Sequence, residues 1–181
     1  MNKLKLLIAS VIILLASSFT VLLTVNWKIK KEYSVKCSIG KDGSTFTGLN
    51  AVILFDEENP ERSKITASID ATTINTGNNE MNAHAKEALN TALFPVITFV
   101  STSITKTISG YEAIGNLTLK GITKTIKFPF YFDSKKTLAL FPFIPKETFN
   151  GSFTIFPKDF SITRKGTPDQ VTISITIPVT K

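Results

Sequence analysis

The chain is poor in the residues that build most catalytic and metal sites. Its 181 residues include one cysteine, Cys37, and one histidine, His84. A single cysteine excludes an intramolecular disulfide, and one imidazole without a second thiol excludes the His- and Cys-rich ligand sets that hold zinc. No glycine-rich phosphate loop is present, and Asp70, Asp133 and Asp159 show no pairing in sequence. We therefore expect a protein that is not an enzyme and needs no metal or cofactor.

Charge is also scarce. Charged residues make up 19% of the chain and apolar residues 43%, a composition that argues against disorder. The net charge is +7, but the lysines are scattered, so nucleic acid is not an expected partner and an anionic lipid surface is favoured only weakly. Fourteen Phe stand against one Trp and three Tyr. Because Phe carries no polar group, these rings are expected in a core, a lumen or a membrane-facing edge.

The first 25 residues have the pattern of an export signal. Lys3 and Lys5 precede an uncharged apolar run over residues 6–25. The small residues at 16–18 offer a cleavage site, which would release a soluble domain. Alternatively the run, close to the ~20 residues that a membrane-spanning helix needs, stays as an anchor that tethers the protein through residues 6–25. Either way, residues 26–181 are expected to form one exported domain.

From residue 27 onward, apolar and polar residues alternate in short runs. The run at 171–177 alternates without a fault, and similar stripes occupy 33–39, 65–70, 111–119 and 122–132, with turn residues between them. This alternation predicts half-buried strands. Residues 79–90 differ, because they have Asn at both ends, Ala in the interior and no β-branched residue, so they predict a short helix. The expected fold is all-β, either a sandwich or a closed barrel, with one short covering helix.

Small residues on the inward stripes bear on whether such a barrel is hollow. Ala67, Ala113, Gly115 and Gly151 interrupt stripes that otherwise carry Ile and Phe. They are compatible with a lumen that has room for one small ligand, and also with a solid core in which small and large residues interdigitate. The residues that we predict to line a ligand-binding lumen are Ile53, Phe55, Ile69, Ile97, Phe99, Tyr111, Ala113, Leu117, Phe128, Phe130, Phe153, Ile173 and Ile175.

An ordered set of motifs resembles the YceI-like family. These motifs are FDEENP at 55–60, INTGN at 74–78, His84, FPxxTFxSTS at 94–103, GNLTLKGITK at 115–124 and KDFSI at 158–162. Trp27 and Ser34 fit the family's first strand, so the likeness covers nearly all of residues 27–181. The resemblance implies a single extended, lipocalin-like antiparallel barrel of about eight strands. It also implies a periplasmic protein that binds polyisoprenoids or other amphiphilic chains.

The expected function is therefore non-catalytic binding of a long apolar or amphiphilic lipid, for carriage, storage or sensing at the cell envelope. The alternative is a ligand-free β-domain that docks another protein. Val52 and Leu54, on the face opposite Ile53 and Phe55, could then mark a subunit contact, including that of a homodimer.

One apolar segment does not fit the strand pattern. Residues 138–144, with the sequence LALFPFI, follow a charged turn and are too apolar for a free loop. They are interpreted either as a portal that faces the membrane surface, formed by Leu138, Phe141 and Phe143, or as ordinary packing onto the barrel.

Overall fold

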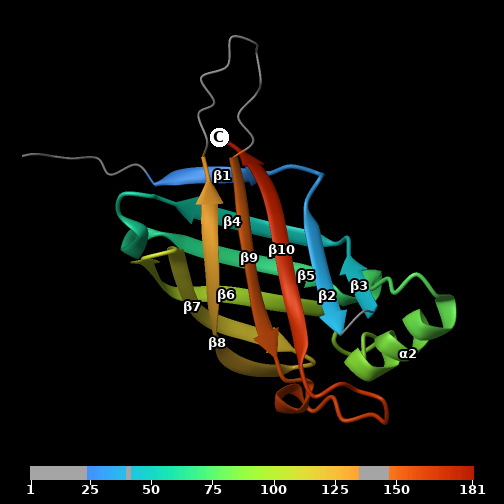
Figure 1. The fold of residues 1–181 in the computed structure, drawn as a ribbon. Helices are drawn as coiled ribbons and strands as arrows, with labels where there is room; N and C mark the ends of the chain where they lie inside the picture. The colour runs from blue at the N-terminus through green and yellow to red at the C-terminus, as the bar shows by residue number, and fades with distance from the viewer. Residues whose placement is uncertain (1–23, 40–41, 135–146) are drawn as a thin grey trace, which may run out of the picture.

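The structure of the protein is a computed structural model that describes residues 24–39, 42–134 and 147–181 (Figure 1). The predicted export segment lies outside these residues, apart from its last two. The predicted portal residues Leu138, Phe141 and Phe143 also lie outside the described residues. No described helix has both the length and the apolar character needed to cross a membrane.

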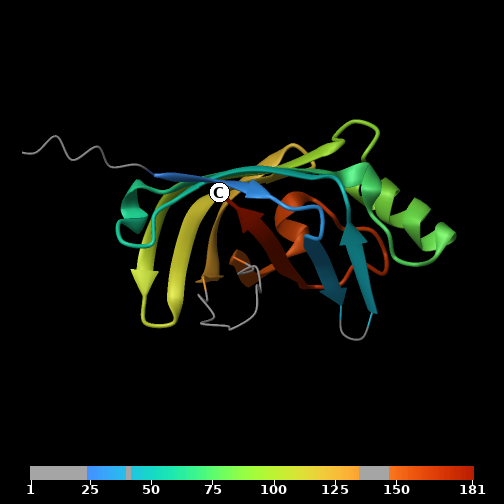
Figure 2. The same ribbon diagram turned by 90° about the horizontal axis from the view of Figure 1, so that it is seen from above.

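Within the described part of the chain, eight strands close into an antiparallel barrel (Figures 1 and 2). They are β1 (Val25–Ile29), β4 (Leu49–Phe55), β5 (Lys64–Asp70), β6 (Val96–Thr107), β7 (Gly110–Leu119), β8 (Ile122–Asp133), β9 (Glu147–Ile155) and β10 (Val171–Thr180). Each strand pairs with the next, and β1 pairs with both β4 and β10 to complete the ring. The predicted all-β barrel of about eight strands is confirmed.

The alternation in the sequence sets the register of these strands. Ala67 of β5 lies opposite Phe99 of β6, which in turn lies opposite Leu117 of β7. Apolar residues therefore meet apolar residues across the sheet. Because a shift of one residue would turn each stripe toward solvent, burial of this face fixes the pairing.

A hairpin extends the wall beyond the ring. It consists of β2 (Ser34–Ile39) and β3 (Asp42–Phe46), and β2 pairs with β10 next to the segment that pairs with β1. A bridge between Thr45 and Asn75 ties β3 to the segment that leads into the helix. The hairpin therefore lengthens the barrel on the side where the helix lies (Figure 1).

The predicted helix at 79–90 is confirmed as α2 (Asn79–Leu89). The Asn78 side-chain oxygen accepts a hydrogen bond from the Met81 backbone N–H at 3.0 Å, which caps the first turn. Asn90 ends the helix in the left-handed conformation, with φ at 52°. Three short 3₁₀ segments lie between the other elements: η1 (Pro60–Arg62) between β4 and β5, η2 (Ala71–Thr73) between β5 and α2, and η3 (Pro157–Phe160) between β9 and β10.

The interior of the barrel holds two separate apolar clusters. The larger surrounds Phe55 and contains five buried aromatic side chains, and the partly buried Phe132 packs against them. We call these six side chains the aromatic plug; they are Trp27, Phe55, Tyr111, Phe130, Phe132 and Phe149. The smaller cluster, around Leu117, Leu119, Phe160 and Ile162, lies toward α2, since Ala88 and Leu89 pack against it. The helix therefore marks the end of the barrel opposite the plug, and we call this the helix end.

Candidate functional site

A cavity of about 710 Å³ lies inside the barrel. Its walls come from strands β2 to β10, from α2 and from connecting residues that include 164–168, and most of the lining side chains are Val, Ile, Leu, Phe or Ala. His84, Arg164 and Lys165 are the charged or imidazole side chains in this lining. No buried side-chain nitrogen or oxygen within the described residues lacks a hydrogen-bond partner. The site therefore offers an incoming molecule apolar contact over nearly all of its surface.

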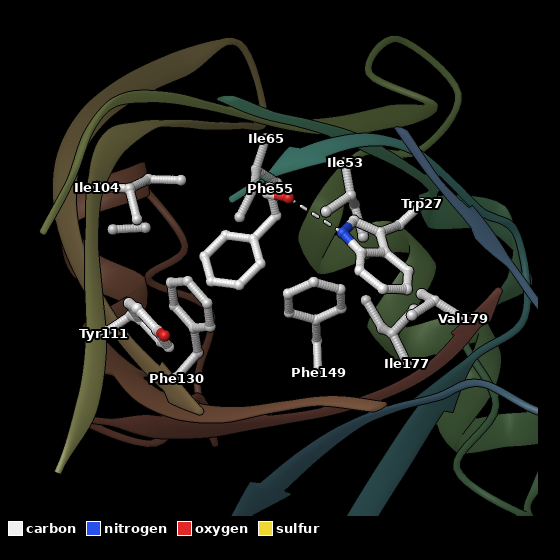
Figure 3. Close-up of a cluster of buried hydrophobic side chains, with 11 residues drawn as sticks. Trp27, Ile53, Phe55, Ile65, Ile104, Tyr111, Phe130, Phe149, Ile177 and Val179 are labelled. Carbon is white, nitrogen blue, oxygen red and sulfur yellow. Dashed lines mark hydrogen bonds between the residues drawn. The ribbon is translucent and has the colours of Figure 1, made fainter. Parts of the chain in front are cut away.

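The aromatic plug closes one end of this cavity. Phe55, which is 1% exposed, lies at its centre. Its ring centroid is 4.9 Å from that of Tyr111, 5.7 Å from Phe130 and 5.2 Å from Phe149, all edge-on (Figure 3). The Trp27 indole N–H donates a hydrogen bond to the Phe55 backbone oxygen at 3.2 Å, which adds a side-chain bond between the neighbouring strands β1 and β4 at this end. Edge-to-face packing at these distances leaves no passage between the rings.

The cavity opens to solvent at the helix end. The lining residues that are themselves exposed include Met81 and His84 on α2 and Arg164, Lys165 and Gly166 in the loop before β10. The Arg164 guanidinium forms an ion pair with the Glu87 carboxylate, which links this loop to α2. The mouth of the cavity therefore lies between α2 and residues 164–168, and its rim is polar and basic.

Nine of the thirteen predicted lumen residues line the cavity. They are Ile53, Ile69, Ile97, Phe99, Leu117, Phe128, Phe153, Ile173 and Ile175. The other four, Phe55, Tyr111, Ala113 and Phe130, lie in the buried cluster of the plug and do not line it. All thirteen face inward, but the four sit at the end of the barrel where facing side chains meet and fill the space. A ligand-binding role for the nine remains a prediction.

Sequence reasoning missed several lining residues. Cys37 and Val35 line the cavity because β2 extends the wall beside β10. Ala85 and Ala88 contribute the small face of α2, three positions apart and hence on one side of the helix. Their spacing was a usable signal, whereas nothing local to residues 164–168 predicted that they would border a cavity.

The small residues on the inward stripes have different roles. A Cβ atom at Gly115 would lie 2.6 Å from the Phe99 ring, and one at Gly151 would lie 2.5 Å from the Phe128 ring. These glycines therefore leave room for the ends of two rings close to the barrel wall. Ala113 is fully buried within the plug. Only Ala67, of the four, leaves its space open as part of the cavity wall.

Cys37 is a half-buried thiol in the cavity wall. Burial raises the pKa of this thiol to about 11, while a hydrogen bond with Ser44 acts in the opposite direction. The group is consequently uncharged at neutral pH. It adds a small apolar surface to the wall, as expected for a free cysteine.

The comparisons with known proteins agree with this architecture. The model of the YceI-like domain matches residues 24–179. The chain belongs to the YceI-like family. The resemblance seen in the motifs is thus confirmed. Protein YceI of Escherichia coli is 38% identical over 84 residues, which cover 45% of this chain and 44% of that protein. This YceI-like chain therefore aligns with less than half of the length of the curated relatives that it matches.

Solved structures share the fold of this YceI-like barrel. BcnA of Burkholderia cenocepacia superposes with a TM-score of 0.71 at 20% identity, over 85% of this chain and all of that one. A polyisoprenoid-binding domain from Saccharophagus degradans superposes with a TM-score of 0.58 at 12% identity, over 87% of this chain and 98% of that one. At these identities the likeness establishes the barrel fold.

Proposed function

We propose that this YceI-like barrel binds a long apolar or amphiphilic lipid of the polyisoprenoid class in its cavity, without doing chemistry on it. The observation that carries the proposal is the cavity of about 710 Å³, which has apolar walls, a closed aromatic end and a polar mouth. Membership of the YceI-like family and the fold shared with a polyisoprenoid-binding domain support it.

The shape of the site suits an amphiphile with its tail inward. Burial of a methylene group is worth roughly 0.8 kcal/mol, so an apolar cavity can draw a chain out of a bilayer only by enclosing most of it. The head group would then lie at the mouth, near Arg164 and Lys165, where water and charge are accessible. Such a protein would carry, store or sense the lipid.

We further propose that the domain is exported to the periplasm and acts next to a membrane surface. The basic, apolar pattern of residues 1–25 supports export, by cleavage or with that segment as an anchor. The ligand class supports proximity to a bilayer, because long isoprenoids reside there.

A blocking substitution tests the proposal. Ala67→Trp places an indole into the cavity from β5, whereas Thr66→Trp places one on the exposed outer face of the same strand. Protein purified from native membranes and extracted with organic solvent should yield a lipid by mass spectrometry from the wild type and from Thr66→Trp. Ala67→Trp should yield at most a tenth as much, with an unchanged circular dichroism spectrum. A wild-type protein that yields no lipid and does not take one up from vesicles would refute the proposed function.

A second candidate function is protein docking on the outer face of the barrel. Val52 and Val100 are 55% and 45% exposed, and both lie opposite Thr66, so the two valines flank this threonine in one outward row across three strands. Leu54, also predicted as a contact, is half-buried. A homodimer through this row would dissociate on Val100→Lys substitution, which sedimentation velocity would detect. A wild-type monomer at high concentration would argue against a homodimer.

A further inference from the structure

The barrel interior is divided along its length into a filled part and an open part. None of the six rings of the aromatic plug lines the cavity. The rings of Phe55, Tyr111, Phe130 and Phe149 point toward one another across the barrel (Figure 3). An apolar tail that enters from the helix end therefore stops at the plug.

Phe128 lies at the boundary between these two parts. Its side chain lines the cavity and also packs against the cluster of the plug. The Phe128 ring centroid is 6.0 Å from Phe130 in the plug, 6.2 Å from Phe99 and 5.1 Å from Phe153, both of which line the cavity. Ile53, Ile65 and Ile177 also line the cavity and belong to that cluster. Phe128 differs from them because its ring contacts a ring of the plug, and it is therefore the aromatic part of the floor on which the end of a tail would rest.

The position of this floor is fixed by its surroundings. The Phe128 ring lies so close to Gly151 that a Cβ atom there would be 2.5 Å away. Phe130 lies behind it, and Phe130 is 5% exposed. Because close-packed interiors yield little to an inserted group, a longer tail cannot push the ring deeper.

The volume above the floor sets the length of tail that can be enclosed. A carbon-sized unit takes about 30 Å³ when packed, the share of a water molecule in the liquid. A cavity of about 710 Å³ then holds on the order of 20–25 such units. Four or five isoprene units fit this volume, whereas eight units or more would leave apolar carbons outside the mouth.

We propose that Phe128, supported by the aromatic plug, limits the ligands of this barrel to tails of about 20–25 carbons, that is, to isoprenoids of four or five units. This inference rests on the proposed lipid-binding function and adds a length selection to it. Phe128 is then a specificity-determining residue.

The test is extraction of isoprenoid alcohols of three to nine units from phosphatidylcholine vesicles. The bilayer and the cavity stabilise each enclosed carbon to about the same extent. The fraction of alcohol extracted should therefore be nearly constant up to four or five units. Each further unit leaves the bilayer without entering the cavity, and extraction should then fall at least tenfold per unit. Gel filtration separates the protein from the vesicles, and mass spectrometry measures the bound alcohol.

Substitutions at the floor should move this cut-off. Phe128→Ala opens space toward the plug and should raise the longest extracted alcohol by at least one unit. If the alanine variant does not fold, Phe128→Leu, which is less disruptive, takes its place and should shift the cut-off in the same direction. Tyr131→Ala, on the exposed outer face of the same strand, is the matched control and should leave the cut-off unchanged.

The outcomes separate the two proposals. If the wild type extracts none of the alcohols, both the function and the length limit are wrong. If it extracts all lengths equally, or if a folded Phe128 variant keeps the wild-type cut-off, the length limit is wrong and lipid binding stands.

Discussion

Truncation of two phenylalanines on the inner face should distinguish a hollow barrel from a solid one. Phe55, 1% exposed, has aromatic rings around it in the plug, whereas Phe153 is half-buried and borders the cavity. Removal of a fully packed Phe costs about 3–5 kcal/mol, because the cavity left behind loses its contacts. A side chain that borders an open space makes no contacts on that side. Phe153→Ala should therefore lower the free energy of unfolding by only about 1–2 kcal/mol.

The assay is urea unfolding of delipidated protein, followed by circular dichroism and by the fluorescence of Trp27. Trp27 is suitable because its ring lies 4.9 Å from Phe132 inside the plug and is 5% exposed. With a slope of about 2 kcal/mol per molar urea, Phe55→Ala should lower the midpoint by about 2 M and Phe153→Ala by less than about 1 M. Tyr131→Ala, on the outer face, should change the midpoint little. Equal losses for the two phenylalanines would refute the division of the interior into plug and cavity.

Two further predictions follow from the cavity wall. Burial raises the pKa of Cys37 from 9.0 to about 11, so its reactive thiolate is about 100-fold scarcer at pH 8 than that of an ordinary thiol. The rate of Cys37 alkylation should rise about tenfold per pH unit up to a pH of about 11. Bound lipid should lower this rate at any pH. A rate at pH 8 equal to that of an exposed cysteine would contradict the burial of the thiol. Gly151→Ala should push the Phe128 ring toward the cavity, lower the free energy of unfolding by about 1–3 kcal/mol and shorten the longest extracted alcohol by one unit. Thermal unfolding that matches the wild type would show that the ring has room to move.

The sequence predicted which side chains of each strand point into the barrel, but not how far along the barrel each of them lies. Phe128, Phe130 and Phe132 follow one another at alternate positions of β8, and their periodicity is identical. The structure places Phe128 beside the cavity and the other two in the plug. This difference depends on which side chains meet from other strands, and a local pattern contains no such information.

The mouth of the cavity was unpredictable for a similar reason. The helix could be predicted because its Ala content and Asn caps are local features. Residues 164–168 show only a turn pattern in sequence. Their position at the mouth depends on contacts such as the ion pair between Arg164 and Glu87, which are 77 residues apart. Long-range pairs of this kind decide where an opening lies, and a single sequence does not reveal them.

The closure of the barrel has a consequence for the order of folding. Strand β10 pairs with β9, β2 and β1, and only two register pairs, Lys28–Thr180 and Ile29–Val179, complete the ring. The partners in this seam come from opposite ends of the described chain. Without β10, strands β1 and β4–β9 form at most a curled sheet with two free edges, the β2–β3 hairpin has no partner strand in that sheet, and no space is enclosed. An enclosed cavity therefore requires this pairing between the two ends of the described chain, and non-local pairings of this kind are intrinsically slow to form.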